Sequence, residues 1–307
     1  MSDESALSIK SERTREGLLA ALVSYSLWGV LPIYFKVVGA VPATEVLVHR
    51  VLWAVPFGLP IVLLRRQWPD VVRALRTPGM LGLLSAAAVL IAINWLTYIW
   101  AVQNERVFQA SLGYYINPLM YVLVGVAAFG DRLSRWQAGA VWLAAAGVAV
   151  LTLSGGEFPL VSLTLAVTFT IYGTIRSRVA IGGMPGLFVE TLVLLPGAVV
   201  YLGWLASEGR AVFLSGDLSV AGLLMLAGPF TVLPLLCFAL AARRLTLSAI
   251  GILQFIAPTL QFLVGLAYGE RLTGAHMVCF ALIWIAVSLF SWDAWRLARS
   301  TAGLADP

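Results

Sequence analysis

Ten long hydrophobic runs, separated by short charged or Gly/Pro-rich breaks, follow one another along the chain. A run of about 20 apolar residues is long enough to cross the hydrocarbon core of a bilayer as a helix. Lipid offers no partner for backbone N–H and C=O groups, so runs of this length are predicted to be helices and not strands. The predicted spans are residues 18–38, 41–64, 79–102, 107–129, 136–153, 158–175, 184–205, 218–242, 245–268 and 273–292.

The composition also indicates a polytopic membrane protein. Of the 307 residues, 60% are hydrophobic and 11% are charged, whereas soluble domains average about 45–50% and 25%. So few charges cannot cover a water-facing surface of this size, which excludes a soluble domain, a disordered chain and a nucleic-acid-binding module. The run 18–38 exceeds the apolar region of about 7–15 residues in a signal peptide, so we expect it to remain as a span.

The distribution of Lys and Arg predicts the orientation. With both termini on one side, the opposite side receives only three of the 20 basic residues, Arg106, Arg210 and Arg271. Two more, Lys36 and Arg50, lie inside spans, and the remaining fifteen fall on the side of the termini. Cytoplasmic loops carry the excess of basic residues, so both termini are predicted to be cytoplasmic.

The chain contains an internal repeat. Residues 24–29 (SYSLWG) match residues 168–173 (TFTIYG) in size and polarity, and Pro56 matches Pro196 at an offset of 140. Residues 130–134 (GDRLS) echo residues 269–273 (GERLT). The sequence therefore predicts an N-terminal segment (1–17), a first five-helix repeat (18–153), a connecting loop (154–157), a second repeat (158–292) and a C-terminal tail (293–307).

Each repeat holds five spans, an odd number, so the second repeat enters the membrane from the opposite side to the first. We expect an all-α polytopic membrane fold with ten transmembrane helices as two inverted five-helix repeats. This architecture is typical of alternating-access transporters, whose site lies near the bilayer midplane where the repeats meet and helices are interrupted. A duplicated membrane scaffold without a substrate is the alternative.

Four segments resemble a known family: residues 24–36 (SYSLWGVLPIYFK), 41–53 (VPATEVLVHRVLW), 93–119 and 228–262. They are similar to the RarD-type permeases, in the EamA branch of the drug/metabolite transporter superfamily, and the resemblance covers nearly all of residues 18–292. It implies a ten-helix transporter of the bacterial inner membrane, from a family named for chloramphenicol sensitivity or resistance.

A pair of prolines related by the repeat, Pro118 and Pro258, points to the transport site. A proline inside a helix leaves the carbonyl four residues back without its usual donor, and here those carbonyls belong to Tyr114 and Gln254. Together with Tyr115 and Asn117 they are predicted to line a polar cavity at mid-depth. A kink that neighbouring helices accommodate is the other interpretation.

Further polar and aromatic side chains share helix faces with this region. Gln254 and Gln261 are two turns apart, and Asn94 and Tyr98 are one turn apart, with Trp95 beside them as an aromatic wall for a planar substrate. Hydrogen bonding between helices explains the Asn and Gln residues equally well.

Charged side chains inside a span cost roughly 2.5–3.5 kcal/mol each at a helix centre, which makes function the default hypothesis. Lys36 and Glu45 flank a short turn near the predicted outer surface, and an ion pair between them is expected. Arg50 lies about 10 Å deep at 1.5 Å per residue. It is predicted either to anchor an anionic group or to pair with Glu45.

Two more ionisable groups are candidates for ion coupling. His49 stands four residues after Glu45, on the same helix face, and an imidazole can exchange protons near neutral pH; a structural role fits it equally well. Glu190 is the repeat partner of Arg50 at an offset of 140, so the two halves are not chemically equivalent.

The remaining sequence features concern partners and rival functions. Gly265 and Gly269 form a small-xxx-small pair that permits close helix approach, within the molecule or in a homodimer. Cys237 and Cys279 show no CxxC spacing, and no cofactor or metal is predicted. An intramembrane enzyme is the rival class, but HExxH and Walker A patterns are missing from the sequence. We therefore expect a lipid-embedded permease that exports a small organic molecule, with no nucleic-acid partner.

Overall fold

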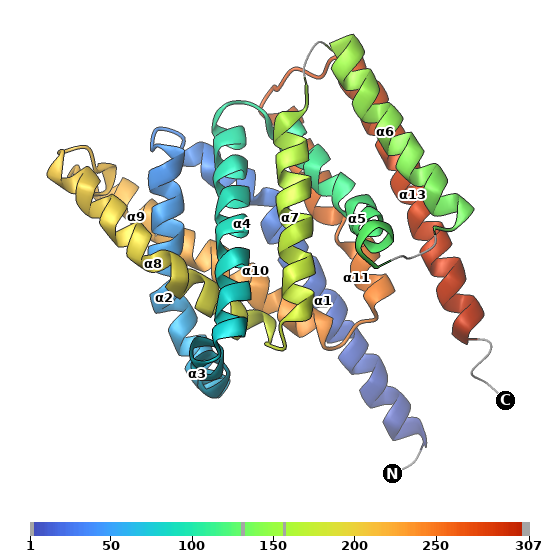
Figure 1. Cartoon of the computed structure of the whole chain (residues 1–307), viewed down its shortest axis with the longest axis horizontal. Helices are drawn as coiled ribbons and strands as arrows, with labels where there is room; N and C mark the ends of the chain where they lie inside the picture. Colours follow the sequence, from blue (N-terminus) through green and yellow to red (C-terminus); the bar gives the residue numbers. More distant parts are fainter. Residues whose placement is uncertain (1–2, 130–132, 156–157, 303–307) are drawn as a thin grey trace.

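The computed structural model describes residues 3–129, 133–155 and 158–302, and the regular structure in this part of the chain is helical. Figure 1 shows the arrangement of the helices. Their bounds are α1 (Asp3–Val37), α2 (Ala43–Leu64), α3 (Trp68–Arg76), α4 (Pro78–Gln103), α5 (Val107–Phe129), α6 (Arg135–Gly155), α7 (Leu160–Arg178), α8 (Gly183–Ser207), α9 (Leu218–Met225), α10 (Ala227–Ala242), α11 (Leu247–Leu253), α12 (Ile256–Ala267) and α13 (Gly274–Ala302), with a 3-10 turn at Val212–Leu214.

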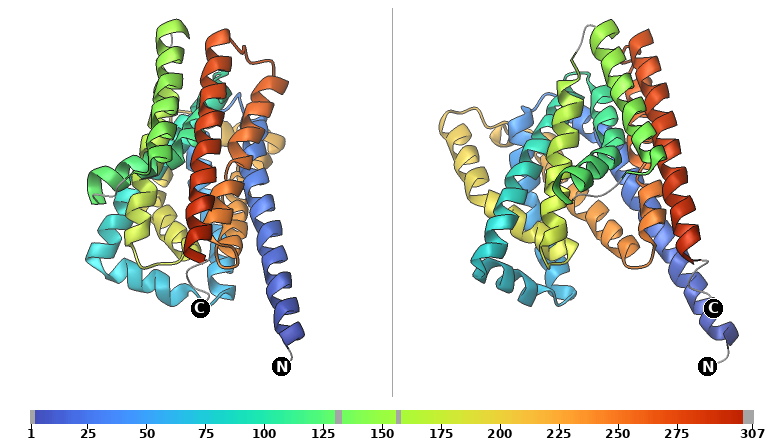
Figure 2. Two further views of the ribbon diagram at one scale, coloured as in Figure 1. Left: turned by 90° about the vertical axis from the view of Figure 1, so that its right-hand side faces the viewer. Right: turned by 45° about the vertical axis from the view of Figure 1, so that its right-hand side comes forward.

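All ten predicted spans correspond to helical segments long and apolar enough to cross a membrane, from Thr14–Val37 to Gly274–Asp293. Helix α1 begins and α13 ends at the same end of the bundle, as an even number of spans requires (Figure 2). We call this the terminus end and the opposite one the far end.

One helix was not predicted. Helix α3 follows the basic pair Arg65 and Arg66 and is too short to span a bilayer. Its Val71 and Ala74 are fully buried, while Asp70 and Arg73 form an exposed ion pair. It is therefore an amphipathic helix that packs against α4 and α8 at the terminus end.

Two spans are broken helices. The span 218–242 is divided into α9 and α10 at Leu226, and the span 245–268 into α11 and α12 at Gln254 and Phe255. Pro229 and Pro258 each follow the break closely and leave the carbonyl four residues back without an amide donor. The interruption at Pro258 agrees with the sequence prediction.

The helix contacts have the pattern expected of an inverted repeat. Helix α1 packs against α10 and α12, while α7, its counterpart in the second half, packs against α4 and α5, the counterparts of those two helices. Helices α2 and α8, α5 and α12, and α6 and α13 are counterparts that pack against each other. Exchanging the halves therefore reproduces the principal contacts.

The aligned glycines Gly29 and Gly173 permit two of these contacts. A Cβ atom added to Gly29 would lie 2.6 Å from the Cβ atom of Leu260 in α12, and one added to Gly173 would overlap the Tyr121 hydroxyl of α5. Gly29 thus lets α1 approach α12 closely, and Gly173 leaves room in α7 for the Tyr121 side chain of α5. This explains why the SYSLWG and TFTIYG motifs both end in glycine.

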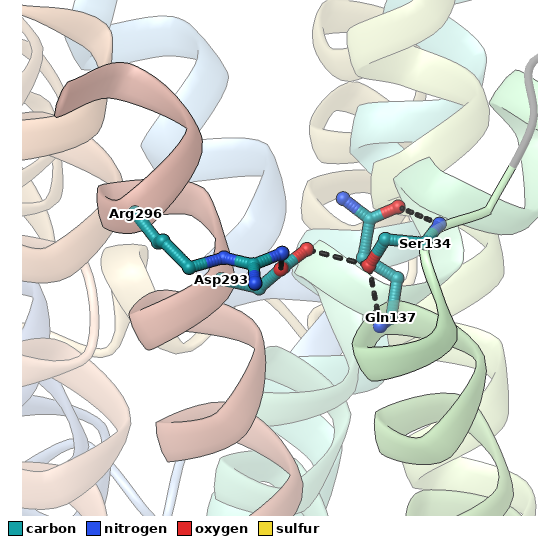
Figure 3. A network of polar contacts seen from close by, with 4 residues as sticks. All are labelled: Ser134, Gln137, Asp293 and Arg296. Carbon is teal, nitrogen blue, oxygen red and sulfur yellow. Dashed lines mark hydrogen bonds and ion pairs between the residues drawn. The ribbon is translucent and has the colours of Figure 1, made fainter. Parts of the chain in front are cut away.

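Helices α6 and α13 form a pair at one side of the bundle (Figure 1). Ser134 and Gln137 make a reciprocal capping box at the start of α6. The Ser134 hydroxyl also donates to the fully buried Asp293 of α13 at 2.6 Å, and Asp293 pairs with Arg296 at 3.1 Å (Figure 3). This network fixes the start of α6 to the last membrane turn of α13.

The two glycine contacts generate a stability prediction. Gly29→Ala should destabilise the purified protein by about 1–3 kcal/mol, the usual cost of overpacking, because the Cβ of Leu260 moves only with its backbone. Gly173→Ala should cost less, since the Tyr121 hydroxyl ends a flexible side chain. Unfolding in detergent measures both, and Gly197→Ala, with no atom within 4 Å of the added Cβ, is the control. An equal effect of Gly29→Ala and Gly197→Ala would contradict the prediction.

Candidate functional site

A buried cation lies between the two halves of the molecule. Arg50 of α2 is 5% exposed, and its Nε donates to the Thr231 hydroxyl of α10 at 2.9 Å. Its Cζ lies 4.1 Å from the ring centroid of Trp95 in α4 and 5.9 Å from that of Phe35 in α1. The guanidinium is thus held by one hydrogen bond and by aromatic faces, a cation–π arrangement.

Three tyrosines surround this cation. The side chains of Tyr34, Tyr98 and Tyr114 are close enough to interact with Arg50 electrostatically. We call Tyr34, Arg50, Asn94, Trp95, Tyr98, Tyr114 and Thr231 the Arg50 cluster. Its members come from α1, α2, α4, α5 and α10, so both halves contribute.

Asn94 organises the polar side of the Arg50 cluster. Its Oδ1 accepts from the Tyr114 hydroxyl at 3.1 Å, and its Nδ2 donates to the Thr168 hydroxyl and the Leu165 carbonyl of α7. The rings of Tyr98 and Tyr114 meet edge to face, 5.6 Å apart. The predicted residues Asn94, Trp95, Tyr98 and Tyr114 are therefore brought together.

The other predicted pathway residues lie in a second region, at the contact of α5 with α12. Tyr115 bonds to the Thr259 hydroxyl at 2.7 Å and stacks on Phe255. The Pro258 carbonyl accepts from Ser111, and Gln261 donates to the Trp28 carbonyl of α1. These contacts hold helices together, so the single polar cavity predicted around both prolines is divided into two regions.

Three residues of that prediction complete the second region. Asn117 is 5% exposed, and its Oδ1 has no hydrogen-bond partner among the described residues. Pro118 follows it within an unbroken α5, whereas Gln254 is partly exposed at the break before α12. The two repeat-related prolines thus differ in effect: α5 continues through Pro118, whereas the helix is interrupted just before Pro258. A helix can accommodate the loss of one amide donor by bending as well as by breaking.

The predicted ion pair between Lys36 and Glu45 is wrong. Lys36 lies over the ring of Tyr268, 5.0 Å from its centroid. Glu45 is fully buried and accepts the backbone N–H of Phe213 at 3.0 Å. The turn between α1 and α2 directs the two side chains to different neighbours.

The alternative pair of Arg50 with Glu45 is wrong for a geometric reason. Five residues along a helix correspond to about 140° of rotation, so the two side chains leave α2 on different faces. Arg50 points to α4 and α10, and Glu45 points to the 3-10 turn at Val212–Leu214.

His49 shares the face of Glu45, as predicted. Its Nε2 lies 3.9 Å from the Glu45 carboxylate, and its Nδ1 accepts the indole N–H of Trp53 at 3.2 Å. The ring is 1% exposed and packs against Phe213 at 4.6 Å between centroids. These contacts describe a buried histidine that helps to hold the 3-10 turn.

Glu190 belongs to an ion pair near the terminus end. Its carboxylate lies 3.2 Å from Nε of Arg176 and accepts the Tyr172 hydroxyl at 3.2 Å. Arg176 also donates to the Gly182 carbonyl, and it occupies the space where a side chain at Gly186 would lie. The pair therefore links α7 to the start of α8.

Sequence reasoning did not single out several of these partners, namely Tyr34, Thr168, Tyr172, Arg176 and Thr231. Arg176 was counted as a loop charge although α7 continues to Arg178. Its spacing of four residues from Tyr172 was a usable signal, because such residues share a helix face. Thr231 lies in an apolar run and gives no comparable signal.

A second carboxylate closes the far end. Glu270, in the loop between α12 and α13, accepts the backbone N–H groups of Val107 at 2.8 Å and Phe108 at 3.0 Å. Those amides belong to the first turn of α5 and have no partner within their helix. Burial raises the pKa of Glu270 to about 7, an effect that Glu105 increases and that the two amides and Lys36 oppose.

Glu45 and Glu270 thus form a reciprocal arrangement, which we call the far-end clasps. Glu45 of the first half binds a backbone amide of the second half, and Glu270 of the second half binds two amides of the first. The segment GERLT supplies Glu270; its counterpart GDRLS includes residues 130–132, which lie outside the described residues.

The glycine pair near this loop has two separate uses. A Cβ on Gly265 would lie 3.0 Å from the Phe108 ring, so Gly265 serves packing inside the molecule. Gly269 has a φ of +76°, which glycine adopts without strain, and forms the turn after α12. A homodimer through small-residue helix faces stays a prediction.

Comparison with known proteins places the chain among transporters. The EamA-like transporter family matches residues 15–153. Protein RarD of Salmonella typhi is 45% identical over 92% of this chain and 97% of its own length, and Protein RarD of Escherichia coli is 42% identical over 95% and 99%. The chloramphenicol-sensitive protein RarD of Pseudomonas aeruginosa is 33% identical over 94% and 97%.

A solved crystal structure with 20% identity covers 89% of this chain and 96% of its own, with a TM-score of 0.58, and supports the fold alone. Ten apolar helices and these relatives define a multi-pass membrane transporter. The chain belongs to the RarD-type permeases of the EamA-like transporter family.

The buried ion pair makes a testable prediction. Arg176→Met should destabilise the protein by about 3–5 kcal/mol, because it leaves the carboxylate of Glu190 buried without its cation. Arg176→Met combined with Glu190→Leu should recover most of that loss, since no charge is then left unpaired. Unfolding of the single and double variants in detergent gives the coupling free energy. Additive losses would show that the two side chains do not act as a pair.

The pKa of Glu270 predicts how stability depends on pH. The folded protein binds this proton more tightly than the unfolded chain, whose carboxyl has the ordinary pKa of 4.5. Stability should therefore fall as pH rises from about 4.5 through about 7. Unfolding midpoints at pH 5 and pH 8 should differ more in the wild type than in Glu270→Gln. The exposed Glu208→Gln is the control, and a smaller pH difference in the wild type than in Glu270→Gln would contradict the assignment.

Proposed function

We propose that this protein is a secondary transporter that exports a small organic solute by alternating access, with the Arg50 cluster as the solute site. The observation that carries the proposal is a buried cation held by side chains of both halves. A group bound there would lie where the two repeats meet, as a site that is exposed alternately to the two sides of the membrane must.

The burial pattern supports a conformation closed at the far end. Residues 107–113 of α5 are all buried there, beneath the far-end clasps. At the terminus end, residues 235–240 of α10 are all partly exposed, although this helix packs against α1 and α2. The far-end part of α5 is therefore more completely buried than the terminus-end part of α10.

The charge distribution supports the orientation. Fifteen of the 20 basic residues fall on the terminus side of the spans, which would place that side in the cytoplasm of a bacterial inner membrane. A conformation closed at the far end would then receive solute from the cytoplasm. Outward movement would be driven by an ion gradient or by the gradient of the solute itself.

Distance measurements between spin labels test alternating access without a known substrate. In a variant with Cys237 and Cys279 replaced by alanine, one pair of labels at positions 106 and 271 reports on the far end. A second pair at positions 76 and 243 reports on the terminus end. All four labelled positions are exposed. The double substitution Glu45→Ala and Glu270→Ala removes both clasps, so it should lengthen the far-end distance and shorten the terminus-end distance.

The control is Asp70→Asn, which removes an exposed carboxylate of α3 and should leave both distances unchanged. A far-end distance that lengthens while the terminus-end distance stays the same would contradict alternating access, because the two ends would then move independently. Distances that stay fixed at both ends in the double variant would contradict it as well.

A further inference from the structure

Arg50 has unused hydrogen-bonding capacity in a buried place. A guanidinium carries five N–H donors in a planar fork, and the Arg50 cluster occupies the one on Nε, through Thr231. The aromatic faces of Trp95 and Phe35 attract the positive charge but accept no conventional hydrogen bond. The outer edge of the fork therefore remains available to a ligand.

Three carboxylates within the helix bundle or its far-end loop contact other groups. Glu45 binds the Phe213 amide, Glu190 pairs with Arg176, and Glu270 binds the start of α5. Among the described residues, no carboxylate lies within ion-pairing distance of Arg50. A buried charge without a counter-ion is unfavourable, and an external anion would provide the counter-ion that the described residues do not.

Tyr98 provides a second free donor. Its hydroxyl is buried, has no hydrogen-bond partner among the described residues, and interacts electrostatically with Arg50. The neighbouring hydroxyls are already used, because Tyr34 donates to the Leu223 carbonyl and Tyr114 to Asn94. The free N–H groups of Arg50 can only donate, and the Tyr98 hydroxyl can donate to the same ligand, which fits a ligand rich in acceptors.

The amide and threonine acceptors of the cluster are engaged as well. Oδ1 of Asn94 accepts from Tyr114, and the Thr231 hydroxyl accepts from Arg50 and donates to the Ala227 carbonyl. An ammonium group would meet the positive charge of Arg50 in this cluster, with only tyrosine hydroxyl oxygens to accept from it. The arrangement therefore discriminates against cations and, less strongly, against neutral amides.

We propose that the transported solute is a small organic anion, bound through a carboxylate that takes two parallel hydrogen bonds from Arg50 and one from the Tyr98 hydroxyl. This rests on the proposed transport function. Carboxylates match the guanidinium fork in a bidentate manner, and the rings of Phe35, Trp95 and Tyr114 favour a planar or aromatic body. Glu190, the repeat partner of Arg50, pairs with Arg176, so the repeat-related position does not form a second site of this kind.

Matched pairs of probes test this inference on the purified full-length protein. The pairs are acetate and acetamide, benzoate and benzamide, and indole-3-acetate and indole-3-acetamide, which differ in charge but hardly in shape. Thermal unfolding in detergent at constant ionic strength reports binding, because a ligand of the folded state raises its stability. The aromatic carboxylates should stabilise the protein at concentrations about tenfold or more below those of their amides, the difference of one charge-assisted bond.

The variants separate a specific site from general charge effects. Arg50→Gln should abolish the preference for the carboxylate. Arg50→Lys should keep only part of it, because lysine retains the charge but cannot bind in a bidentate manner. Tyr98→Phe, which keeps the ring and removes the hydroxyl, should weaken carboxylate binding several-fold. The control is Arg135→Gln, which removes an exposed arginine that also lies over a tryptophan, Trp136, at 5.0 Å. It should bind like the wild type.

Three results would overturn the anion site: equal stabilisation by carboxylates and amides, including none by either; a carboxylate preference that survives Arg50→Gln; or chloride and phosphate acting as strongly as benzoate. The last would indicate an inorganic-ion site. These outcomes are separable from failure of the transport proposal, because the spin-label distances need no ligand. Reciprocal movement of the two ends without carboxylate preference would leave a transporter for another class of solute.

Discussion

A charged side chain buried among apolar helices needs an ion-pair or hydrogen-bond partner. The positions of the buried polar groups in this protein follow from that constraint. Glu45 accepts a backbone amide and lies beside a histidine, and Glu190 pairs with Arg176 and accepts the Tyr172 hydroxyl. Arg50 differs from both, because aromatic faces and one hydroxyl contact it and most of its donors stay free. Glu45 and Glu190 therefore contribute to the contacts between helices, whereas the free donors of Arg50 are the basis of the proposed anion site.

The two halves share the same helix packing, but they differ in their charged residues and in their helix breaks. Equivalent glycines bring α1 to α12 and α7 to α5, so the backbone contacts are repeated. The equivalent positions 50 and 190 carry opposite charges, and within the described part of the chain only the glutamate has an ion-pair partner. Pro258 ends a helix where Pro118 does not. The helix packing is thus symmetric, whereas the buried charge with free donors occurs at Arg50 in the first half.

Run length and composition predicted the ten spans, because the thickness of the bilayer imposes that length on any helix that crosses it. Helix α3 was missed, since a short amphipathic helix produces no long apolar run. The grouping of Asn94, Trp95 and Tyr98 was accessible from helix periodicity, which acts within one element. The partners of Glu45 and Glu270 were not accessible: their amide donors lie more than 160 residues away in the chain, and only the rotation and docking of whole helices brings them near.

The far-end clasps bind main-chain amides and not side chains. Their strength therefore does not depend on which amino acids stand at positions 107, 108 and 213, provided that none is proline, the one residue without an amide hydrogen. The hydrogen bonds of this closure should consequently survive any change of side chain at these three positions that preserves the packing, whereas they require a carboxylate at both glutamate positions.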